Sequence, residues 1–134
     1  MLNYVQKIAE LIAPQVEGVE MDEILSMIET PADSKMGDYA FPCFKLARVL
    51  RKAPPMIAKG IAEAIADDPM FEKVEQVNAY VNMFISKDEF AKEVVSEVIS
   101  AGDAYGSSDI GGGRPVVVEY SSPNIAKPFH IGHI

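Results

Sequence analysis

Apolar residues recur every three to four positions through most of the first hundred residues, with polar residues between them. This spacing gathers apolar side chains on one face of a helix, so it predicts amphipathic helices that share a core. Pro14 ends the first helix, Pro54 opens the fourth, and Ser86 begins a capping box. The predicted helices cover about residues 2–12, 21–28, 45–50, 54–66 and 87–100.

The period changes to two between Val77 and Ile85, where apolar residues alternate with polar and aromatic ones. Alternation of this kind is typical of a strand with two unlike faces. Asn78, Tyr80 and Asn82 should then share the face opposite the apolar one. The sequence therefore predicts an α+β domain in which a small antiparallel sheet packs against helices.

The clearest linker lies between Tyr105 and Arg114 and includes three consecutive glycines. Glycine-rich stretches act as flexible connections, so we expect one domain over residues 1–110 and a second unit over residues 111–134. The β-branched run within residues 115–120 predicts a buried parallel strand, the first of a unit that the sequence does not complete. Such a strand should be exposed or take up a partner, because an unpaired apolar edge invites association.

Charge narrows the ways in which this chain can meet nucleic acid. The sequence has 12 Lys and Arg against 20 Asp and Glu, a net charge of −8. Counterion release requires clustered cations, so any contact with RNA should use a local patch. No apolar run approaches the roughly 20 residues that span a bilayer, and residues 1–7 lack the features of a secretory signal. We therefore expect a cytoplasmic protein with no membrane partner.

Cys43 is the only cysteine, which excludes an intrachain disulfide and a cysteine-cluster metal site. We expect it to be a small buried hydrophobe rather than a nucleophile, since no histidine precedes position 130 to activate it. The sequence predicts no metal site formed by residues of the chain.

The segment that carries the most chemistry runs from Ser121 to His133. A predicted buried strand leads through a loop into His130-Ile131-Gly132-His133, at what should be the start of a helix. Unpaired N–H groups and the helix dipole favour a phosphate there, and two histidines three apart lie near one another. Gly132 lets a flat ring approach the backbone, and such donors can stabilise charge as an acyl adenylate forms. By spacing alone, a His-x-x-His pair can also be structural, and it lacks the further ligands of a zinc site.

This segment resembles the HIGH signature of class I aminoacyl-tRNA synthetases, in the form found in arginine–tRNA ligases. The resemblance rests on Ser-Pro-Asn at 122–124 and on Lys127, three residues before His130. It implies that Lys127, His130 and His133 act in catalysis. It also implies that these three residues and Gly132 bind ATP.

The same resemblance implies an arginine site beside the ATP site. Its residues would be Glu119, Ser122 and Asn124. A carboxylate suits a guanidinium because it can accept two parallel N–H···O bonds. Residues 111–134 would then open a Rossmann-like catalytic domain, with residues 115–120 as its first strand.

The resemblance extends upstream, to the additional N-terminal domain that these ligases carry. Residues 37–47 look like a loop and helix of that domain, and Tyr80 and Asn82 match its aromatic-x-Asn pattern. In the family this region touches the D-loop of the tRNA, which implies tRNA contacts by Tyr80, Asn82 and Asn78. An aromatic ring can stack on an unpaired base while an amide reads the edge of the base. Ala79 stands where the family usually has glycine.

These resemblances imply that the parent enzyme joins L-arginine to tRNA(Arg), using ATP and its Mg²⁺ to form arginyl-adenylate first. Residues 1–110 would recognise the tRNA, and the chain alone should not aminoacylate, because most of the nucleotide-binding fold would follow Ile134. Two alternatives remain. One is a nucleotidyltransferase that shares the His-x-Gly-His element, although its motif strand usually sits near the chain start. The other is a non-catalytic module that binds RNA or protein.

Overall fold

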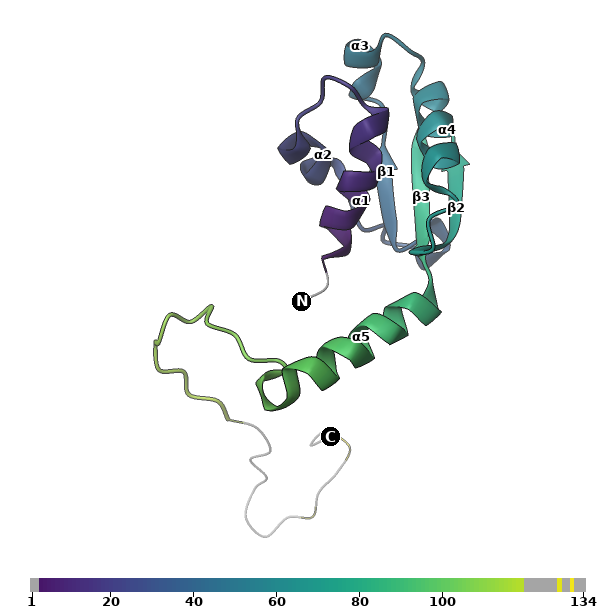
Figure 1. Cartoon of the computed structure of the whole chain (residues 1–134). Coiled ribbons are helices and arrows are strands. Elements are labelled where there is room, and N and C mark those ends of the chain that lie inside the picture. The colour runs from purple at the N-terminus through teal and green to yellow at the C-terminus, as the bar shows by residue number, and fades with distance from the viewer. Residues whose placement is uncertain (1–2, 120–127, 129–130, 132–134) are drawn as a thin grey trace. The chain divides into compact units, whose positions relative to one another are not determined.

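The computed structural model describes residues 3–119, 128 and 131. The chain divides into two compact units, Met1–Gly102 and Asp103–Ile134. Short 3₁₀ turns follow the first helix at Ala13–Gln15 and precede the first strand at Ser34–Met36. The helices and strands, all in the first unit, are α1 (Tyr4–Ile12), α2 (Met21–Met27), β1 (Tyr39–Pro42), α3 (Leu46–Leu50), α4 (Pro54–Ile65), β2 (Phe71–Val77), β3 (Tyr80–Ile85) and α5 (Lys87–Ala101) (Figure 1).

The helices lie where the apolar spacing predicts them, and their ends have identifiable local causes. Asn3 caps α1, because its side chain accepts a hydrogen bond from the N–H of Gln6. Pro54 occupies the first position of α4, where its missing N–H needs no partner. Ser86 caps α5, accepting from the N–H of Glu89 at 3.4 Å, as the capping box predicts.

Three antiparallel strands form one sheet in the order β1-β3-β2. The single strand predicted over residues 77–85 is wrong in its extent, because the chain turns at Asn78 and Ala79 and forms a β2–β3 hairpin. The alternation of residue types continues through that turn, so the period alone does not reveal it. Strand β1 is absent from the sequence prediction, since four residues are too few to establish a period of two. The predicted α+β class, a small antiparallel sheet packed with helices, is confirmed.

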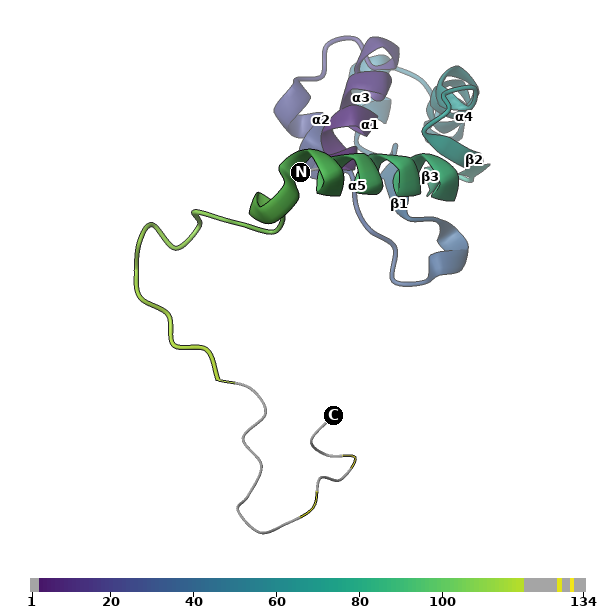
Figure 2. The same ribbon diagram turned by 60° about the horizontal axis from the view of Figure 1, so that its bottom comes forward.

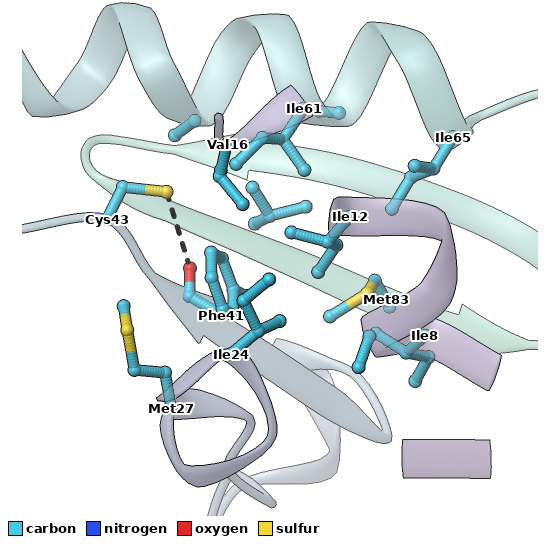
Figure 3. Close-up of a cluster of buried hydrophobic side chains, with 14 of the residues drawn as sticks. Ile8, Ile12, Val16, Ile24, Met27, Phe41, Cys43, Ile61, Ile65 and Met83 are labelled. Atoms are coloured by element: carbon cyan, nitrogen blue, oxygen red, sulfur yellow. Dashed lines mark hydrogen bonds between the residues drawn. The ribbon is translucent and has the colours of Figure 1, made fainter. Parts of the chain in front are cut away.

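One face of the sheet packs against helices and forms the hydrophobic core. Helix α4 contacts β2 and β3, and α1 contacts α4 (Figures 1 and 2). The predicted apolar faces of α1 and α4 are buried in this core. Fully buried members of the cluster include Ile8, Ile12, Phe41, Ile61, Ile65 and Met83 (Figure 3).

A tight loop closes β1 onto β3 at one end of the sheet. The N–H of Asp38 donates to the carbonyl of Met83 at 2.9 Å, and the N–H of Ile85 donates to Oδ2 of Asp38 at 2.8 Å. Gly37, the residue before Asp38, has a φ of +103°, which lies in the region that favours glycine. A Cβ on Gly37 would lie only 2.7 Å from the carbonyl oxygen of Met83. The glycine therefore allows two backbone segments to approach each other directly.

Helix α5 is attached to α1 by one polar cluster. The carboxylate of Glu93 accepts hydrogen bonds from Oη of Tyr4 at 2.9 Å and from Nζ of Lys7 at 2.6 Å. Burial, and then the hydrogen bond to Glu93, raises the pKa of Tyr4 to about 12, so its hydroxyl stays a donor. The hydrogen bond from Lys7 lowers the pKa of Glu93. The cluster thus favours the charged carboxylate.

This cluster makes a pH-dependent contribution to stability. Because the pKa of Glu93 is lower in the folded state than its ordinary value of 4.5, its contribution is complete above that value. It is lost as the pH falls through the lowered pKa. The contribution should be at most about 1 kcal/mol, since the pair is partly exposed. The free energies of unfolding in urea of the native chain and of Glu93→Gln should differ by a constant amount from pH 5 to 8, and the two values should converge in more acidic buffer. A difference that persists in acid would contradict this assignment.

The second unit contains a 3₁₀ turn at Gly102–Ala104, which begins at the boundary, and no strand among its described residues. The strand predicted over residues 115–120 is not formed at 115–119, and Tyr120 lies outside the described residues. Val116, Val117 and Val118 are 75%, 95% and 72% exposed. A strand needs a neighbouring strand to exchange backbone hydrogen bonds, and the sheet of the described residues contains only β1, β3 and β2. Within the described ranges, no helix has the length and apolar character required to cross a bilayer.

Candidate functional site

The candidate site is the face of the sheet that points away from the core. Val81 and Met83 on β3 are completely buried in the core. Successive side chains of a strand point to opposite faces, so Tyr80, Asn82 and Phe84 share the other face. We call these three residues, with Phe44, the outer-face cluster.

An aromatic pair forms one end of this cluster. The rings of Phe44 and Tyr80 have centroids 5.4 Å apart and an interplanar angle of 76°, an edge-to-face arrangement. Pro42 of β1 is the cross-strand partner of Tyr80, and the ladder continues with the N–H of Cys43 donating to the carbonyl of Ala79 at 2.8 Å. Phe44 therefore follows directly from the end of β1. It is 54% exposed, so the pair presents aromatic surface to solvent.

Sequence reasoning missed Phe44 as a site residue. It placed this phenylalanine at the approach to a helix and did not identify β1, so nothing connected it with Tyr80, 36 positions later. The available signal was that this aromatic residue lies within residues 37–47, the segment that resembles the N-terminal domain of arginine–tRNA ligases. Only the pairing of β1 with β3 brings the two rings together.

Asn82 lies at the centre of the sheet, between Ala40 of β1 and Glu75 of β2. It lies on the face opposite the apolar one, as the alternation predicts, but it is only 3% exposed. Its Oδ1 is buried and has no hydrogen-bond partner in the described part of the chain. Leaving a buried acceptor unpaired costs about 1–3 kcal/mol, and such a group in a folded protein requires an explanation.

The opposite end of the cluster is electrically balanced. Nζ of Lys73 lies 5.3 Å from the centre of the Phe84 ring, within the range of a cation–π contact. The same ammonium forms an ion pair with Glu75. At the other end of the cluster, the residue after Phe44 is Lys45, which is exposed and forms no ion pair within the described residues.

Asn78 does not share the strand face on which it was predicted to lie. It is an exposed residue of the β2–β3 turn with a φ of +53°, and its carbonyl accepts a hydrogen bond from Nε2 of Gln76. Asparagine tolerates this left-handed region better than most residues. Ala79 beside it is 2% exposed and has no positive φ, so the turn accommodates the side chain of this residue.

Most of the predicted ATP and arginine residues lie outside the described part of the chain. These residues are Ser122, Asn124, Lys127, His130, Gly132 and His133. Glu119, the last residue of the continuous described segment, is exposed and belongs to no helix or strand. The structure therefore brings together Tyr80 and Asn82, and adds Phe44 to them.

Cys43 is completely buried beside this region, as predicted from the sequence. Burial raises the pKa of its thiol to about 12, and the thiol donates weakly to the carbonyl of Phe41 (Figure 3). A protonated, inaccessible thiol is a poor nucleophile. Cys43 therefore contributes to packing and not to the chemistry of the site.

Family models place the chain among known proteins. The model described as "Arginyl tRNA synthetase N terminal domain" matches residues 4–85, which include the whole outer-face cluster. The chain belongs to this family. A second model, described as "tRNA synthetases class I (R), catalytic domain", matches residues 73–134. The resemblance drawn from the sequence is thereby confirmed.

Curated relatives agree with the family models over the full length of the chain. It is 47% identical over 134 residues to the arginine–tRNA ligase of Alkaliphilus metalliredigens, covering 100% of this chain and 24% of the relative. It is 52% identical over 133 residues to the arginine–tRNA ligase of Clostridium perfringens, covering 99% and 23%. The chain thus spans about a quarter of the length of the curated relatives it matches.

A solved structure shares the fold. Thermus thermophilus arginyl-tRNA synthetase matches with a TM-score of 0.54 and 23% identity, covering 99% of this chain and 21% of that one. The arrangement of helices around a small antiparallel sheet is therefore one that a solved member of the family also has.

Proposed function

We propose that this chain is part of an arginine–tRNA ligase, which activates arginine with ATP and transfers it to tRNA(Arg). The observation that supports this most strongly is the order of the two family matches, an N-terminal domain followed by the beginning of a class I catalytic domain. Curated relatives named as arginine–tRNA ligases are 47% and 50% identical to this chain over 134 and 133 residues. This succession disfavours a nucleotidyltransferase and a free-standing interaction module.

The two parts of the chain would have different tasks. Residues 1–110 form the tRNA-recognition domain, and residues 111–134 form the linker and the start of the catalytic domain. The outer-face cluster would contact the D-loop of the tRNA. Tyr80 would stack on an unpaired base, and the amide of Asn82 would gain the hydrogen-bond partner that it lacks within the described chain. Asn78, in the adjoining turn, is exposed and within the same region.

The C-terminal segment would supply the first part of the active site. His130, His133 and Lys127 would donate to ATP phosphates and stabilise the charge that develops as the adenylate forms. Gly132 would let the adenine approach the backbone. Mg²⁺ would arrive with the phosphates of ATP, as part of the substrate.

Glu119 would bind the guanidinium of arginine, with Ser122 and Asn124 completing the arginine site. The enzyme would work in the cytoplasm.

An aminoacylation assay tests this proposal. The full-length protein should charge tRNA(Arg) with arginine in an ATP-dependent reaction, and the 134-residue chain should show no turnover in arginine-dependent ATP–pyrophosphate exchange, even with tRNA present. Charging with a different amino acid by the full-length protein would overturn the assignment. Turnover by the chain alone would overturn the division of tasks between its two parts.

A further inference from the structure

The stretch from residue 39 to residue 62 has an unusual charge for this chain. It contains Lys45, Arg48, Arg51, Lys52 and Lys59 and no Asp or Glu, although the chain as a whole has a net charge of −8. Four of these cations lie within eight residues: Lys45 is the N-cap of α3, Arg48 lies within the helix, and Arg51 and Lys52 follow it directly. We call Lys45, Arg48, Arg51 and Lys52 the α3 cation cluster.

These cations are not neutralised by the protein. All four side chains are exposed, and none forms an ion pair within the described part of the chain. By contrast, Lys59 at the edge of the stretch forms an ion pair, with its Nζ 3.8 Å from Oε1 of Glu63. A set of unpaired, neighbouring like charges repels itself and adds nothing to the stability of the fold. It does create a local positive potential in an acidic molecule.

The α3 cation cluster begins at the residue after Phe44, at the aromatic end of the outer-face cluster. Lys45 follows Phe44, whose ring lies against Tyr80. Arg48 is three residues after Lys45, a spacing that places two side chains on the same side of a helix. An exposed aromatic pair with free cations beside it combines the two kinds of contact that single-stranded nucleic acid offers, a base face and a phosphate.

Arg51 ends α3 in a left-handed conformation, with φ of +50° and ψ of +39°. Glycine is the usual residue at such a position, because it has no Cβ to strain the backbone there. A cation near the C-terminus of a helix is stabilised by the unpaired carbonyl groups there. One cation is sufficient for this interaction, so it does not explain a cluster of four. Arg51 therefore occupies a backbone conformation in which glycine would be less strained than arginine.

We propose that the α3 cation cluster binds the phosphate backbone of the RNA whose base is held at the outer-face cluster. This rests on the proposed function, because it takes the partner of Phe44 and Tyr80 to be RNA. The cations recognise phosphates and carry no base specificity, so they set affinity and register while the outer-face cluster reads the base. An acidic domain thereby obtains the local patch that RNA binding requires.

The proposal is tested by the salt dependence of tRNA binding. The chain is titrated into labelled tRNA(Arg) at 50, 100 and 200 mM KCl, and fluorescence anisotropy gives the dissociation constant. Each phosphate contact contributes about 0.7–0.9 to the slope of log K against log salt. Arg48→Gln/Lys52→Gln should therefore lower the magnitude of the slope by about 1.4–1.8, and its loss of affinity relative to the native chain should shrink roughly 10-fold between 50 and 200 mM.

Two further variants exclude trivial explanations. Lys35→Gln/Lys87→Gln removes the same charge from two exposed lysines that form no ion pair within the described residues. Lys35 shortly precedes Asp38 and Lys87 shortly follows Ile85, at the opposite end of β3 from Tyr80, so the slope of this variant should match that of the native chain. Arg51→Gly removes a cation and relieves the left-handed backbone, so it should weaken binding while thermal stability stays equal or rises. Reduced stability with unchanged binding would overturn the role of Arg51.

The outcomes separate this inference from the proposed function. An equal loss of slope in both double variants, or no loss in either, would overturn the role of the α3 cation cluster in phosphate binding. If Tyr80→Ala still weakens binding in that case, the proposed role of the outer-face cluster in base binding stands. Absence of tRNA binding by the native chain at 50 mM KCl would overturn both. Competition by polyglutamate as effective as by tRNA at equal charge would reassign the cations to an acidic protein partner.

Discussion

Gly37→Ala is expected to lower the free energy of unfolding by about 3 kcal/mol. Two causes act together. The φ of +103° is strained for any residue with a Cβ, and the new methyl would lie 2.7 Å from the carbonyl oxygen of Met83. That oxygen belongs to the central strand and already accepts the N–H of Asp38, so it cannot move aside without breaking the β1–β3 closure. Urea unfolding followed by circular dichroism measures the difference.

Gly60→Ala is a matched control. Gly60 lies within α4, has no positive φ, and a Cβ there would meet no atom within 4 Å. Alanine should therefore stabilise the domain by about 0.5–1 kcal/mol, since it reduces the freedom of the unfolded chain. If both alanines change stability by less than 1 kcal/mol, the close approach at Gly37 does not govern the closure of the sheet.

Tyr80→Ala is expected to weaken the binding of tRNA(Arg) roughly 10- to 100-fold at fixed salt, because stacking a base on an aromatic side chain contributes about 1–3 kcal/mol. Tyr80→Phe keeps the ring and its edge-to-face contact with Phe44, so it should bind nearly as well as the native chain. The measurement is fluorescence anisotropy with labelled tRNA, with thermal unfolding of each variant as a check on folding. Equal affinities of Tyr80→Ala and the native chain would remove the stacking role.

Asn82→Leu extends this test without loss of the fold. Leucine has nearly the shape of asparagine and removes the Oδ1 that is buried without a partner, so stability should be unchanged or higher. Binding of tRNA should nevertheless weaken, because the base loses its hydrogen-bonding partner. A variant that is less stable but binds normally would show that the amide serves the fold and not the ligand.

The helices and the family resemblance could be derived from the sequence because both are local properties. The spacing of Ile57, Ile61 and Ile65 is sufficient to place α4, and Pro54 to begin it. The Tyr80-x-Asn82 pattern and the segment ending at His133 are short enough to be read directly. Each of these features depends on residues within a few positions of one another.

The hairpin and the site could not be derived in the same way. The alternation from Val77 to Ile85 runs through the turn without interruption, whereas the chain reverses at Asn78, which adopts a positive φ. Phe44 reaches Tyr80 through a strand of four residues that no pattern indicates. The sequence places Asn82 on the face opposite the apolar one, but it does not indicate that the residue is buried on the central strand β3.

The sequence alone determined the helices, the α+β class and the family of this chain, because periodicity and motifs are written in neighbouring residues. Tertiary structure decided which strand is central, and that choice buries Asn82 and pairs Phe44 with Tyr80. Pairing between distant segments depends on hydrogen bonds and side-chain packing across the sheet, and no local pattern contains that information.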